Sequence, residues 1–423
     1  MVKKNIKKPF LVGGLLTGFF AVSYFGIAQL TQNVYLNEDQ NITKEEKLKE
    51  VASVKVADTK ASGESVKTEL SVVHLKTPEP LKGIYMTACA GSMPSFRERL
   101  AKIADDTEIN AIIIDVKDYS GTISFRSDNP LLKDNSASGC KISDLREFVA
   151  NLHEKGIYTI ARITVFQDPY YSKKHPELAV KRASDGAIWK DRKGLSFIDV
   201  GAKPYWDYII ALGEESYKLG FDELNFDYIR FPSDGDMKDI DFTWSKGKNK
   251  AVALEEFFVY LHEKLSPTGA KLSADLFGMT TTNTDDLNIG QVLERTLPYF
   301  DYVMPMVYPS HYPPYFNGWK NPNLHVYGVV NFSMSHAVSR AEATTTPIYL
   351  KGSYRIGTTT PPRYTKTPEN RLKLRPWLQD FQYGGTYGAT EVRAQINATY
   401  DAGLTSWILW DPANKYTLGA LER

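Results

Sequence analysis

Five apolar runs of this chain end in an aspartate, a residue that is rarely buried without a partner. Two of these aspartates, Asp227 and Asp275, fall on the polar face of an alternating pattern, in Glu-Leu-Asn-Phe-Asp and Leu-Ser-Ala-Asp-Leu. Two inward carboxyl groups suit glycoside hydrolysis, because one protonates the leaving oxygen while the other attacks the anomeric carbon or activates a water. Their mutual repulsion would raise one pKa and leave a protonated acid near neutral pH. We therefore predict Asp227 as nucleophile or base and Asp275 as acid.

Polar and aromatic side chains close the other runs and could support this pair or bind substrate. Flat aromatic rings, Trp377 among them, offer faces to sugar rings. Arg162 ends another run, and it could orient a carboxylate or an anionic sugar, or pair with a core aspartate. The candidates for support or substrate binding are Asp115, Lys117, Arg230, Tyr308, His311, Asp380, Trp410 and Asp411.

A structural interpretation competes with the catalytic one. Asp227 could pair with Arg230 or Lys117 in a buried ion network, since polar layers occur inside barrels. Asp115 and Asp411 could cap loops, and His311 could be an ordinary loop histidine.

The elements that would position these residues alternate along the chain. Short apolar runs predict eight strands, at Lys82–Ala88, Asn110–Val116, Ile157–Val165, Glu223–Ile229, Lys271–Phe277, Tyr302–Tyr308, Leu374–Phe381 and Ser406–Asp411. Apolar spacing near 3.6 predicts helices at Ser95–Asp105, Ser143–Lys155, Pro204–Leu219, Ala251–Leu265, Asp286–Pro298, Ser333–Glu342 and Ala389–Ala402.

Strands that alternate with helices predict a parallel sheet, and eight such units predict an α/β fold of the (β/α)8 TIM-barrel type. A doubly wound open sheet usually carries a glycine-rich phosphate turn after its first strand, whereas this chain has Cys-Ala-Gly-Ser-Met-Pro there. Ile348–Tyr354 could add a further strand. In such barrels the active site lies at the carboxyl ends of the strands, where the aspartates fall.

Composition excludes several classes of function. The chain of 423 residues has 51 Lys and Arg against 50 Asp and Glu, which disfavours nucleic acid as a partner. Its 7 histidines form no paired spacing, so a zinc site is disfavoured. No organic cofactor and no catalytic metal is expected, although clustered aspartates can hold calcium. Cys89 and Cys140 could form one bridge or remain two buried thiols.

The amino terminus predicts export. Lysines precede an uncharged run from Pro9 to Leu30, which is long enough to cross a bilayer. We predict a cytoplasmic lysine cluster and transmembrane anchor over 1–30, a flexible spacer over 31–80 and the barrel over 81–423, outside the cytoplasm. A cleaved signal peptide, giving a secreted protein, is the alternative.

Four motifs carry a resemblance to a known family. They are Lys-Gly-Ile-Tyr-Met-Thr (82–87), Asn-Ala-Ile-Ile-Ile-Asp-Val-Lys-Asp (110–118), Asn-Phe-Asp-Tyr-Ile-Arg-Phe-Pro (225–232) and Met-Pro-Met-Val-Tyr-Pro-Ser-His-Tyr (304–312). Together they resemble the putative glycoside hydrolase family of exported bacterial barrel proteins, which is distantly similar to α-amylase-type glycosidases. The amylase pattern implies a nucleophile at Asp227, an acid at Asp275 and a supporting aspartate at Asp380. The chain departs from that pattern at the acid, where it has Asp in place of Glu.

The resemblance and the residues predict a glycoside hydrolase that acts on an extracytoplasmic or cell-envelope polysaccharide or oligosaccharide. The alternative is a catalytically inactive glycan-binding or envelope-organising barrel protein, because a fold alone does not establish activity. Polysaccharide deacetylation is a weaker third possibility, since it would need a metal site. The sequence indicates no oligomeric state.

Overall fold

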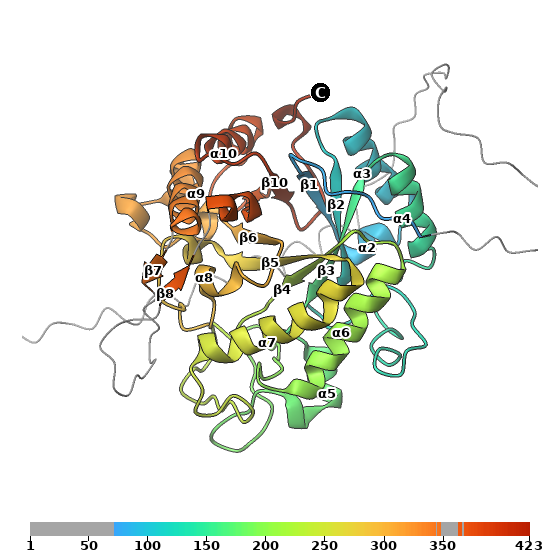
Figure 1. Cartoon of the computed structure of the whole chain (residues 1–423), viewed down its shortest axis with the longest axis vertical. Helices are drawn as coiled ribbons and strands as arrows, with labels where there is room; N and C mark the ends of the chain where they lie inside the picture. Colours follow the sequence, from blue (N-terminus) through green and yellow to red (C-terminus); the bar gives the residue numbers. More distant parts are fainter. Residues whose placement is uncertain (1–71, 344, 348–362, 366–367) are drawn as a thin grey trace, which may run out of the picture. The chain divides into compact units, whose positions relative to one another are not determined.

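The computed structural model describes residues 72–343, 345–347, 363–365 and 368–423. Eight parallel strands close into a barrel in the order β1-β10-β9-β6-β5-β4-β3-β2 (Figure 1). Each strand overlaps one of the predicted runs, so the (β/α)8 prediction is confirmed. The barrel strands are β1 (Lys82–Met86), β2 (Ala111–Lys117), β3 (Tyr158–Thr164), β4 (Glu223–Asp227), β5 (Lys271–Phe277), β6 (Tyr302–Met306), β9 (Trp377–Gln379) and β10 (Trp407–Trp410).

Helices surround the barrel, and a small antiparallel pair, β7 (Thr345–Pro347) and β8 (Arg363–Thr365), lies outside it. The helices are α2 (Ala88–Gly91), α3 (Pro94–Asp106), α4 (Leu145–Glu154), α5 (Pro169–Lys174), α6 (Lys203–Lys218), α7 (Lys250–Leu265), α8 (Leu293–Thr296), α9 (Val326–Glu342) and α10 (Ala389–Asp401). Short 3-10 turns occur at Pro176–Leu178, Ser266–Thr268, Gly278–Thr281, Pro309–His311, Phe316–Gly318, Pro322–Leu324, Pro368–Lys373 and Leu418–Ala420.

Local signals explain where most helices begin and end. The side chain of Asn249 caps α7 by accepting a hydrogen bond from the Ala251 amide over 3.0 Å. Gly156, Gly220 and Gly403 follow three helices with φ of 73°, 112° and 84°, a left-handed conformation that glycine adopts without strain.

One predicted helix is largely absent. The sequence predicts a helix over Asp286–Pro298, but only Leu293–Thr296 is helical. Leu287 and Asn288 have φ of 50° and 59°, and the Asp286 side chain accepts a hydrogen bond from the Asn288 amide over 2.9 Å. This local turn competes with the first turns of a helix, which is the usual effect of aspartate and asparagine at such positions.

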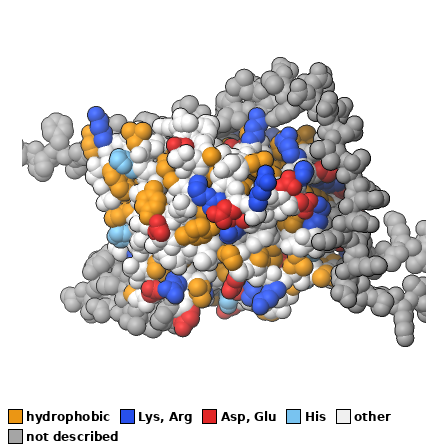
Figure 2. Space-filling model, turned by 90° about the horizontal axis from the view of Figure 1, so that it is seen from above, with side chains coloured by type: hydrophobic (Ala, Val, Ile, Leu, Met, Phe, Trp, Pro, Cys, Tyr) orange, Lys and Arg blue, Asp and Glu red, His pale blue; other side chains and the backbone are white. Residues whose placement is uncertain are grey.

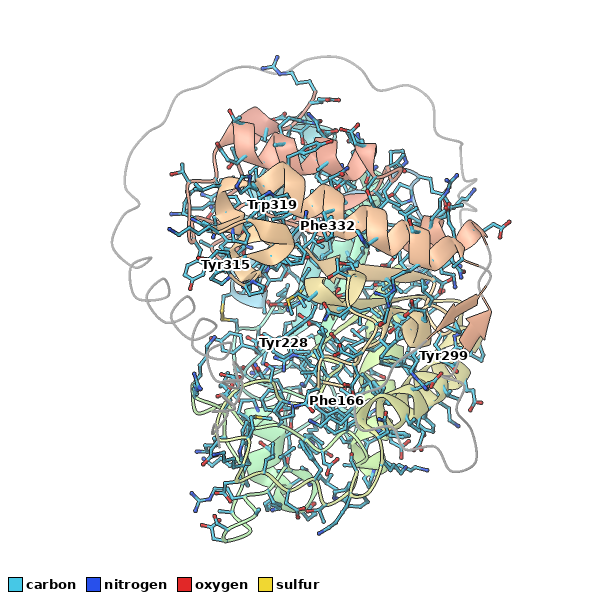
Figure 3. All side chains as sticks on the ribbon, turned by 90° about the vertical axis from the view of Figure 1, so that its left-hand side faces the viewer. Phe166, Tyr228, Tyr299, Tyr315, Trp319 and Phe332 are labelled. Carbon is cyan, nitrogen blue, oxygen red and sulfur yellow. A yellow bond between two sulfur atoms is a disulfide. The ribbon has the colours of Figure 1, made fainter. Side chains whose placement is uncertain are left out.

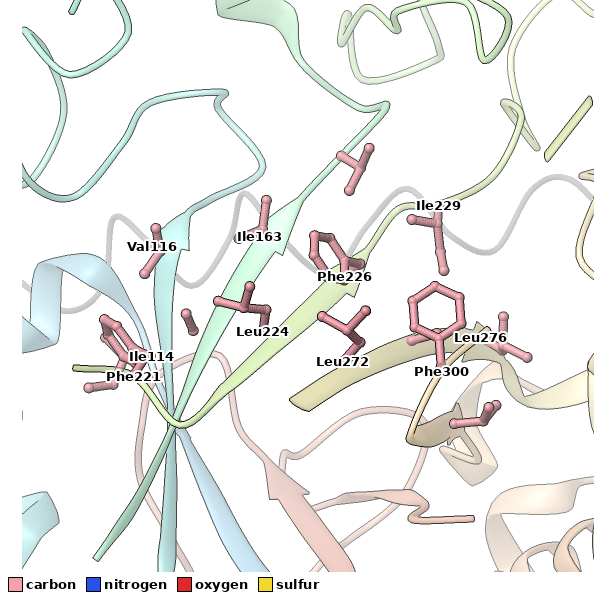
Figure 4. Close-up of a cluster of buried hydrophobic side chains, with 14 of the residues drawn as sticks. Ile114, Val116, Ile163, Phe221, Leu224, Phe226, Ile229, Leu272, Leu276 and Phe300 are labelled. Atoms are coloured by element: carbon pink, nitrogen blue, oxygen red, sulfur yellow. The ribbon is translucent and has the colours of Figure 1, made fainter. Parts of the chain in front are cut away.

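The strands separate two apolar layers, as their alternation predicts. Side chains of one parity, such as Ile114, Leu224 and Phe226, pack between the sheet and the helices (Figure 4). Side chains of the other parity fill the barrel, and Asn225 there donates hydrogen bonds to Ser273 Oγ and Asp275 Oδ1. The pairing of Phe226 with Ala274 brings Asp227 and Asp275 to the same level of the sheet.

Residues 72–80, which the sequence assigns to the end of the spacer, contact the barrel. The Leu75 amide donates a hydrogen bond to Asp222 Oδ1 over 2.6 Å, and the His74 ring stacks on Tyr217 at 3.9 Å. Asp222 immediately precedes β4, so these contacts lie at the amino-terminal end of the strands.

The remaining amino-terminal expectations fall elsewhere. The predicted anchor over 1–30, the spacer up to residue 71 and the additional strand at Ile348–Tyr354 lie outside the described residues. In the part of the chain that is described, no helix combines the length and apolar character needed to cross a bilayer.

Cys89 and Cys140 form a disulfide, with their Cα atoms 5.0 Å apart. The sequence left a bridge and two thiols as equal possibilities, and the structure has the bridge. It joins α2, which follows β1, to the loop that follows β2, so two loops at the carboxyl ends of the strands are covalently linked.

Candidate active site

Arg162 joins three carboxyl groups inside the barrel. It extends from β3 and donates hydrogen bonds to Asp115 Oδ1, over 2.6 Å, and to Asp227 Oδ2. Its Nε atom lies 3.8 Å from Asp275 Oδ2. The three acids end or nearly end β2, β4 and β5, so one guanidinium connects three strands at their carboxyl ends.

Asp275 is the most enclosed of these acids, with 1% of its surface exposed. Its Oδ1 atom accepts hydrogen bonds from Asn225 Nδ2, over 2.9 Å, and from Trp377 Nε1, over 2.8 Å. Burial, followed by the negative charge of Asp227, raises the pKa of Asp275 well above its usual value. The carboxyl group that the sequence assigns as the acid is therefore the one that the site keeps protonated.

Asp115 forms a second branch of the cluster. Its Oδ1 atom is bound by Arg162, and its Oδ2 atom accepts a hydrogen bond from the Tyr85 hydroxyl. Burial raises the pKa of Asp115 to about 6, against the opposing effect of Arg162. The guanidinium also lies 5.4 Å from the centre of the Tyr85 ring.

Gln291 fixes the ends of β4 and β5 relative to each other. Its Nε2 atom donates to the carbonyls of Ile229 and Asp275, and its Oε1 atom accepts from the Phe277 amide over 2.9 Å. This buried amide thereby holds the segment after Asp227 beside the strand that carries Asp275. Nothing in the sequence marked Gln291, because its contacts are with backbone groups distant along the chain.

Lys117 does not support Asp227 as the structural interpretation of the sequence suggested. It is fully buried and pairs with Asp168, Nζ to Oδ2 at 2.9 Å, while donating to the Thr164 carbonyl. The β2–β3 register shifts between Asp115 and Lys117, so Lys117 pairs with Ile163 on the helix side of the sheet. The bulge, invisible in the sequence, directs this lysine away from the barrel centre.

Arg230 also lacks the predicted ion pair with Asp227. Its Nη1 atom donates to the Phe231 carbonyl and to Ser233 Oγ, and its guanidinium lies 4.9 Å from the ring centres of both Tyr228 and Phe277. Figure 3 shows Tyr228, the residue after Asp227, among the side chains of the barrel region, while Trp319 and Phe332 lie beside α9.

Asp380 and Asp411 lie at strand ends but turn away from Asp227. Asp380 binds the backbone amide and hydroxyl of Thr417, and Asp411 accepts from the amides of Ala413 and Lys415. For Asp411 this is the loop-capping role that the sequence left open. Burial raises the pKa of Asp380 to about 7 and that of Asp411 to about 6. The supporting role that the amylase pattern implies for Asp380 has no contact behind it.

Aromatic residues gather beside the carboxyl cluster. The rings of Tyr308 and Trp410 stack at 5.2 Å, and Phe381 meets Trp410 edge-on at 5.0 Å. His311 lies 5.3 Å from Tyr308, and burial lowers its pKa to about 4, so its ring is neutral at physiological pH. Tyr85, the partner of Asp115, lies 6.3 Å from the Trp410 ring, which joins this aromatic group to the acids.

The structure thus brings together Asp115, Asp227 and Asp275 and sets the rings of Tyr308 and Trp410 beside them. Two contributors to the site, Tyr85 and Asn225, were not singled out as candidates. Both lie within the quoted motifs, and the inward parity of Asn225 was the signal that could have identified its role. Among the described residues, no group of three or more histidine, cysteine, aspartate or glutamate side chains could hold a metal ion.

Comparisons with solved structures support the architecture. The glycoside hydrolase domain of PgaB (BpsB) from Bordetella bronchiseptica covers 81% of this chain, and 99% of that domain is covered, at 14% identity and a TM-score of 0.54. A hypothetical protein from Ruminiclostridium thermocellum is 35% identical over 45% of this chain and 96% of its own, with a TM-score of 0.42. The glycoside hydrolase domain of PelA from Pseudomonas aeruginosa covers 80% of this chain and 97% of its own, at 12% identity and a TM-score of 0.41.

No curated protein matches the chain in sequence. A family profile described as "putative glycosyl hydrolase domain" matches residues 83–416, from β1 through β10. The match spans well over half of the chain and includes every carboxyl group described above. The chain therefore belongs to this glycosyl hydrolase family and is an enzyme of the glycosidase class.

Proposed function

We propose that the chain hydrolyses O-glycosidic bonds of an extracytoplasmic or cell-envelope polysaccharide by two-carboxylate chemistry, with Asp275 as general acid and Asp227 as nucleophile or base. One observation carries the proposal: Arg162 contacts the carboxyl groups of both residues at the carboxyl ends of adjacent strands. The environments of the two acids differ in the direction that the reaction requires.

The hydrogen bonds of Asp275 indicate which of its oxygens carries the proton. Asn225 and Trp377 both donate to Oδ1, so the proton of the neutral acid resides on Oδ2. That oxygen is also the one that faces Arg162 and the neighbouring Asp227. Oδ2 is therefore the atom that would protonate the departing glycosidic oxygen.

Asp227 meets the needs of the second carboxylate. Its Oδ2 atom is paired with Arg162, and its Oδ1 atom accepts a hydrogen bond from the Tyr228 amide over 2.5 Å. Arg162 thus supplies the countercharge that an ionised carboxylate needs inside the barrel. The anion so held would attack the anomeric carbon or take a proton from water.

The stacked rings of Tyr308 and Trp410 provide an apolar face for a sugar. Trp410 is partly exposed, so one side of the pair remains available for a ligand. On this proposal, Trp410→Ala raises KM about tenfold with a small effect on kcat, whereas Trp410→Phe retains most of the affinity because it keeps a ring. Equal KM in wild type and Trp410→Ala would remove Trp410 from the binding site.

The test of activity is the release of reducing ends from a panel of bacterial envelope polysaccharides and exopolysaccharides by the whole chain. Asp227→Asn and Asp275→Asn should each lower the rate, by about 10²–10⁴-fold for the loss of an acid or base. Asp106→Asn is the matched control, since its carboxylate forms an exposed pair with Lys102. Wild-type release by Asp227→Asn would contradict its catalytic role.

A catalytically silent glycan-binding protein is the second candidate, and the enclosure of the acids favours it. Asp227 and Asp275 expose only 4% and 1% of their surfaces, so a sugar must displace part of the surrounding protein to reach them. Binding without release of reducing ends by the wild type, with equal affinity in Asp227→Asn, would support this alternative.

We further propose that the chain is held at the membrane through residues 1–30, with the barrel outside the cytoplasm. The disulfide Cys89–Cys140 supports an oxidising compartment, and the printed sequence carries the basic and apolar run described above. Protease added to intact cells should degrade the barrel, and the protein should sediment with membranes. Release into the medium would favour a cleaved signal peptide.

A further inference from the structure

Arg230 is a buried cation without a carboxylate partner. It exposes 8% of its surface, and among the described residues no carboxylate oxygen lies within ion-pair distance of its guanidinium. Its printed hydrogen bonds come from Nη1 alone and go to two uncharged acceptors, the Phe231 carbonyl and Ser233 Oγ. Burying a charge without an anionic partner is costly, so this arrangement calls for an explanation.

Three aromatic rings hold the guanidinium in place. Those of Tyr228 and Phe277 lie 4.9 Å from it, and that of Phe197 lies 5.7 Å from it. Contacts between a cation and ring faces offset part of the cost of burial. They also fix the orientation of the planar fork, which lowers the entropy lost when the fork binds a ligand.

These rings connect Arg230 to the catalytic candidates. Tyr228 directly follows Asp227, and Phe277 is the last residue of β5, which carries Asp275. Gln291 bonds to Ile229, Asp275 and Phe277 and so ties the Arg230 segment to the end of β5. Arg230 therefore lies in a segment that is positioned by the same contacts as the two carboxyl groups.

A second cation lies close by. Burial lowers the pKa of the half-buried Lys193, and the positive charge of Arg230 lowers it further. Lys193 also acts on His311, which contacts the Tyr308 ring. Asp191 and Asp234 influence both cations, but neither carboxylate is within ion-pair distance of Arg230.

The surface as a whole does not explain this local charge. In Figure 2, Lys and Arg side chains lie among Asp and Glu side chains over the described part of the face in view, without a broad basic patch. Arg162, the other arginine of the site, is already bound to Asp115 and Asp227. An anion at the site would consequently find its partner in Arg230.

We infer that Arg230 binds an anionic group on the glycan, which makes the substrate an acidic polysaccharide; this inference deepens the glycosidase function proposed above and rests on it. The fork of an arginine matches both carboxylate and phosphate oxygens, so the group is a sugar carboxylate or a sugar phosphate. Neutral glycans lack the charge that Arg230 is placed to meet.

Three sugars that share one ring and differ at C6 test the inference: glucose, glucuronate and glucose 6-phosphate. Their affinities for the whole chain are measured by ligand-observed NMR at low salt, for wild type, Arg230→Gln and Arg230→Lys. Arg182→Gln is the control, because Arg182 forms an exposed pair with Asp185. We expect wild type and Arg182→Gln to bind one acidic sugar about tenfold more tightly than glucose, and Arg230→Gln to lose that preference.

The outcomes separate the inference from the proposed function, because binding is read without bond cleavage. A preference for glucuronate indicates a carboxylated glycan, and a preference for glucose 6-phosphate indicates a phosphorylated one. The inference is overturned if wild type shows no preference for either acidic sugar, or if the preference survives in Arg230→Gln. Should Arg230→Gln fail to fold, Arg230→Lys decides, since it keeps the charge but loses the fork and should weaken the preference. Preference without release of reducing ends from any polysaccharide would sink only the hydrolase proposal.

Discussion

The indole nitrogen of Trp377 donates a hydrogen bond to Asp275 Oδ1 over 2.8 Å, from β9 to β5 through the barrel interior. This bond favours the ionised form of Asp275, whereas burial and Asp227 favour the protonated form more strongly. The pKa of the acid is therefore set by a balance that a single side chain can shift.

Removal of this hydrogen bond should move the pH dependence of catalysis. Trp377→Phe raises the pKa of Asp275 further, so the acid stays protonated to higher pH and the alkaline limb of kcat/KM moves upward. The matched control is Trp407→Phe, which removes an indole bond to Tyr400 on the helix side of β10. An alkaline limb that is unchanged in Trp377→Phe, or shifted equally in the control, would argue against Asp275 as the acid.

Arg162 should matter for stability as well as for chemistry. Arg162→Met leaves Asp115 and Asp227 buried without their cation, and the loss of one partner of a buried pair costs about 3–5 kcal/mol. We expect a loss of that size in the free energy of unfolding at pH 7, measured with urea, and a smaller loss at pH 4, where Asp115 is protonated. Arg182→Met, at an exposed pair, should change stability by less than about 0.5 kcal/mol. Equal losses at both pH values would contradict the electrostatic explanation.

Asp380 should make the fold less stable as the pH rises. Its folded pKa of about 7 lies above the unfolded value of about 4, so the folded state binds the proton more tightly. The stabilisation is complete below about pH 4 and is lost as the pH rises through about 7. Melting temperatures at pH 4.5 and pH 8 should therefore differ less in Asp380→Asn than in wild type. An undiminished difference would show that other groups cause the slope.

The disulfide should contribute measurably to stability. Cys89 and Cys140 are separated by 51 positions, and a loop of this size corresponds to about 4 kcal/mol in the chain-entropy description. The double variant Cys89→Ala/Cys140→Ala should melt at a lower temperature than oxidised wild type, and a reductant should lower the melting temperature of wild type alone. A melting temperature that does not respond to reductant would show that the bond is absent in solution.

Strand parity accounts for what the sequence predicted well. The two-residue period of β4 places Asn225 and Asp227 inward, and hydrogen bonds in the interior confirm this. The same rule could have excluded Asp380 and Asp411, because the inward Trp377 and Ile408 have the opposite parity. Their position at strand ends drew attention, although their side chains serve the loop around Thr417 and Ala413.

The partners of the charged residues were beyond the reach of the sequence. Lys117 follows a bulge that reverses its direction, and Arg162 reaches Asp227 only because β3 and β4 are neighbours in the closed sheet. Both facts depend on three-dimensional register. For the same reason the pattern could place a cation near Asp227 without deciding between Arg162, Lys117 and Arg230.

The chain joins the barrel at the pole opposite its carboxyl cluster. Leu75 is bonded to Asp222 just before β4, and Asp227 stands at the far end of the same strand. A pull on the chain ahead of Val72 would load this lower rim first and leave the upper loops undisturbed. A long polymer could therefore thread across the open mouth without crossing the protein's own leash, which leaves the enzyme free to work on material that moves past it.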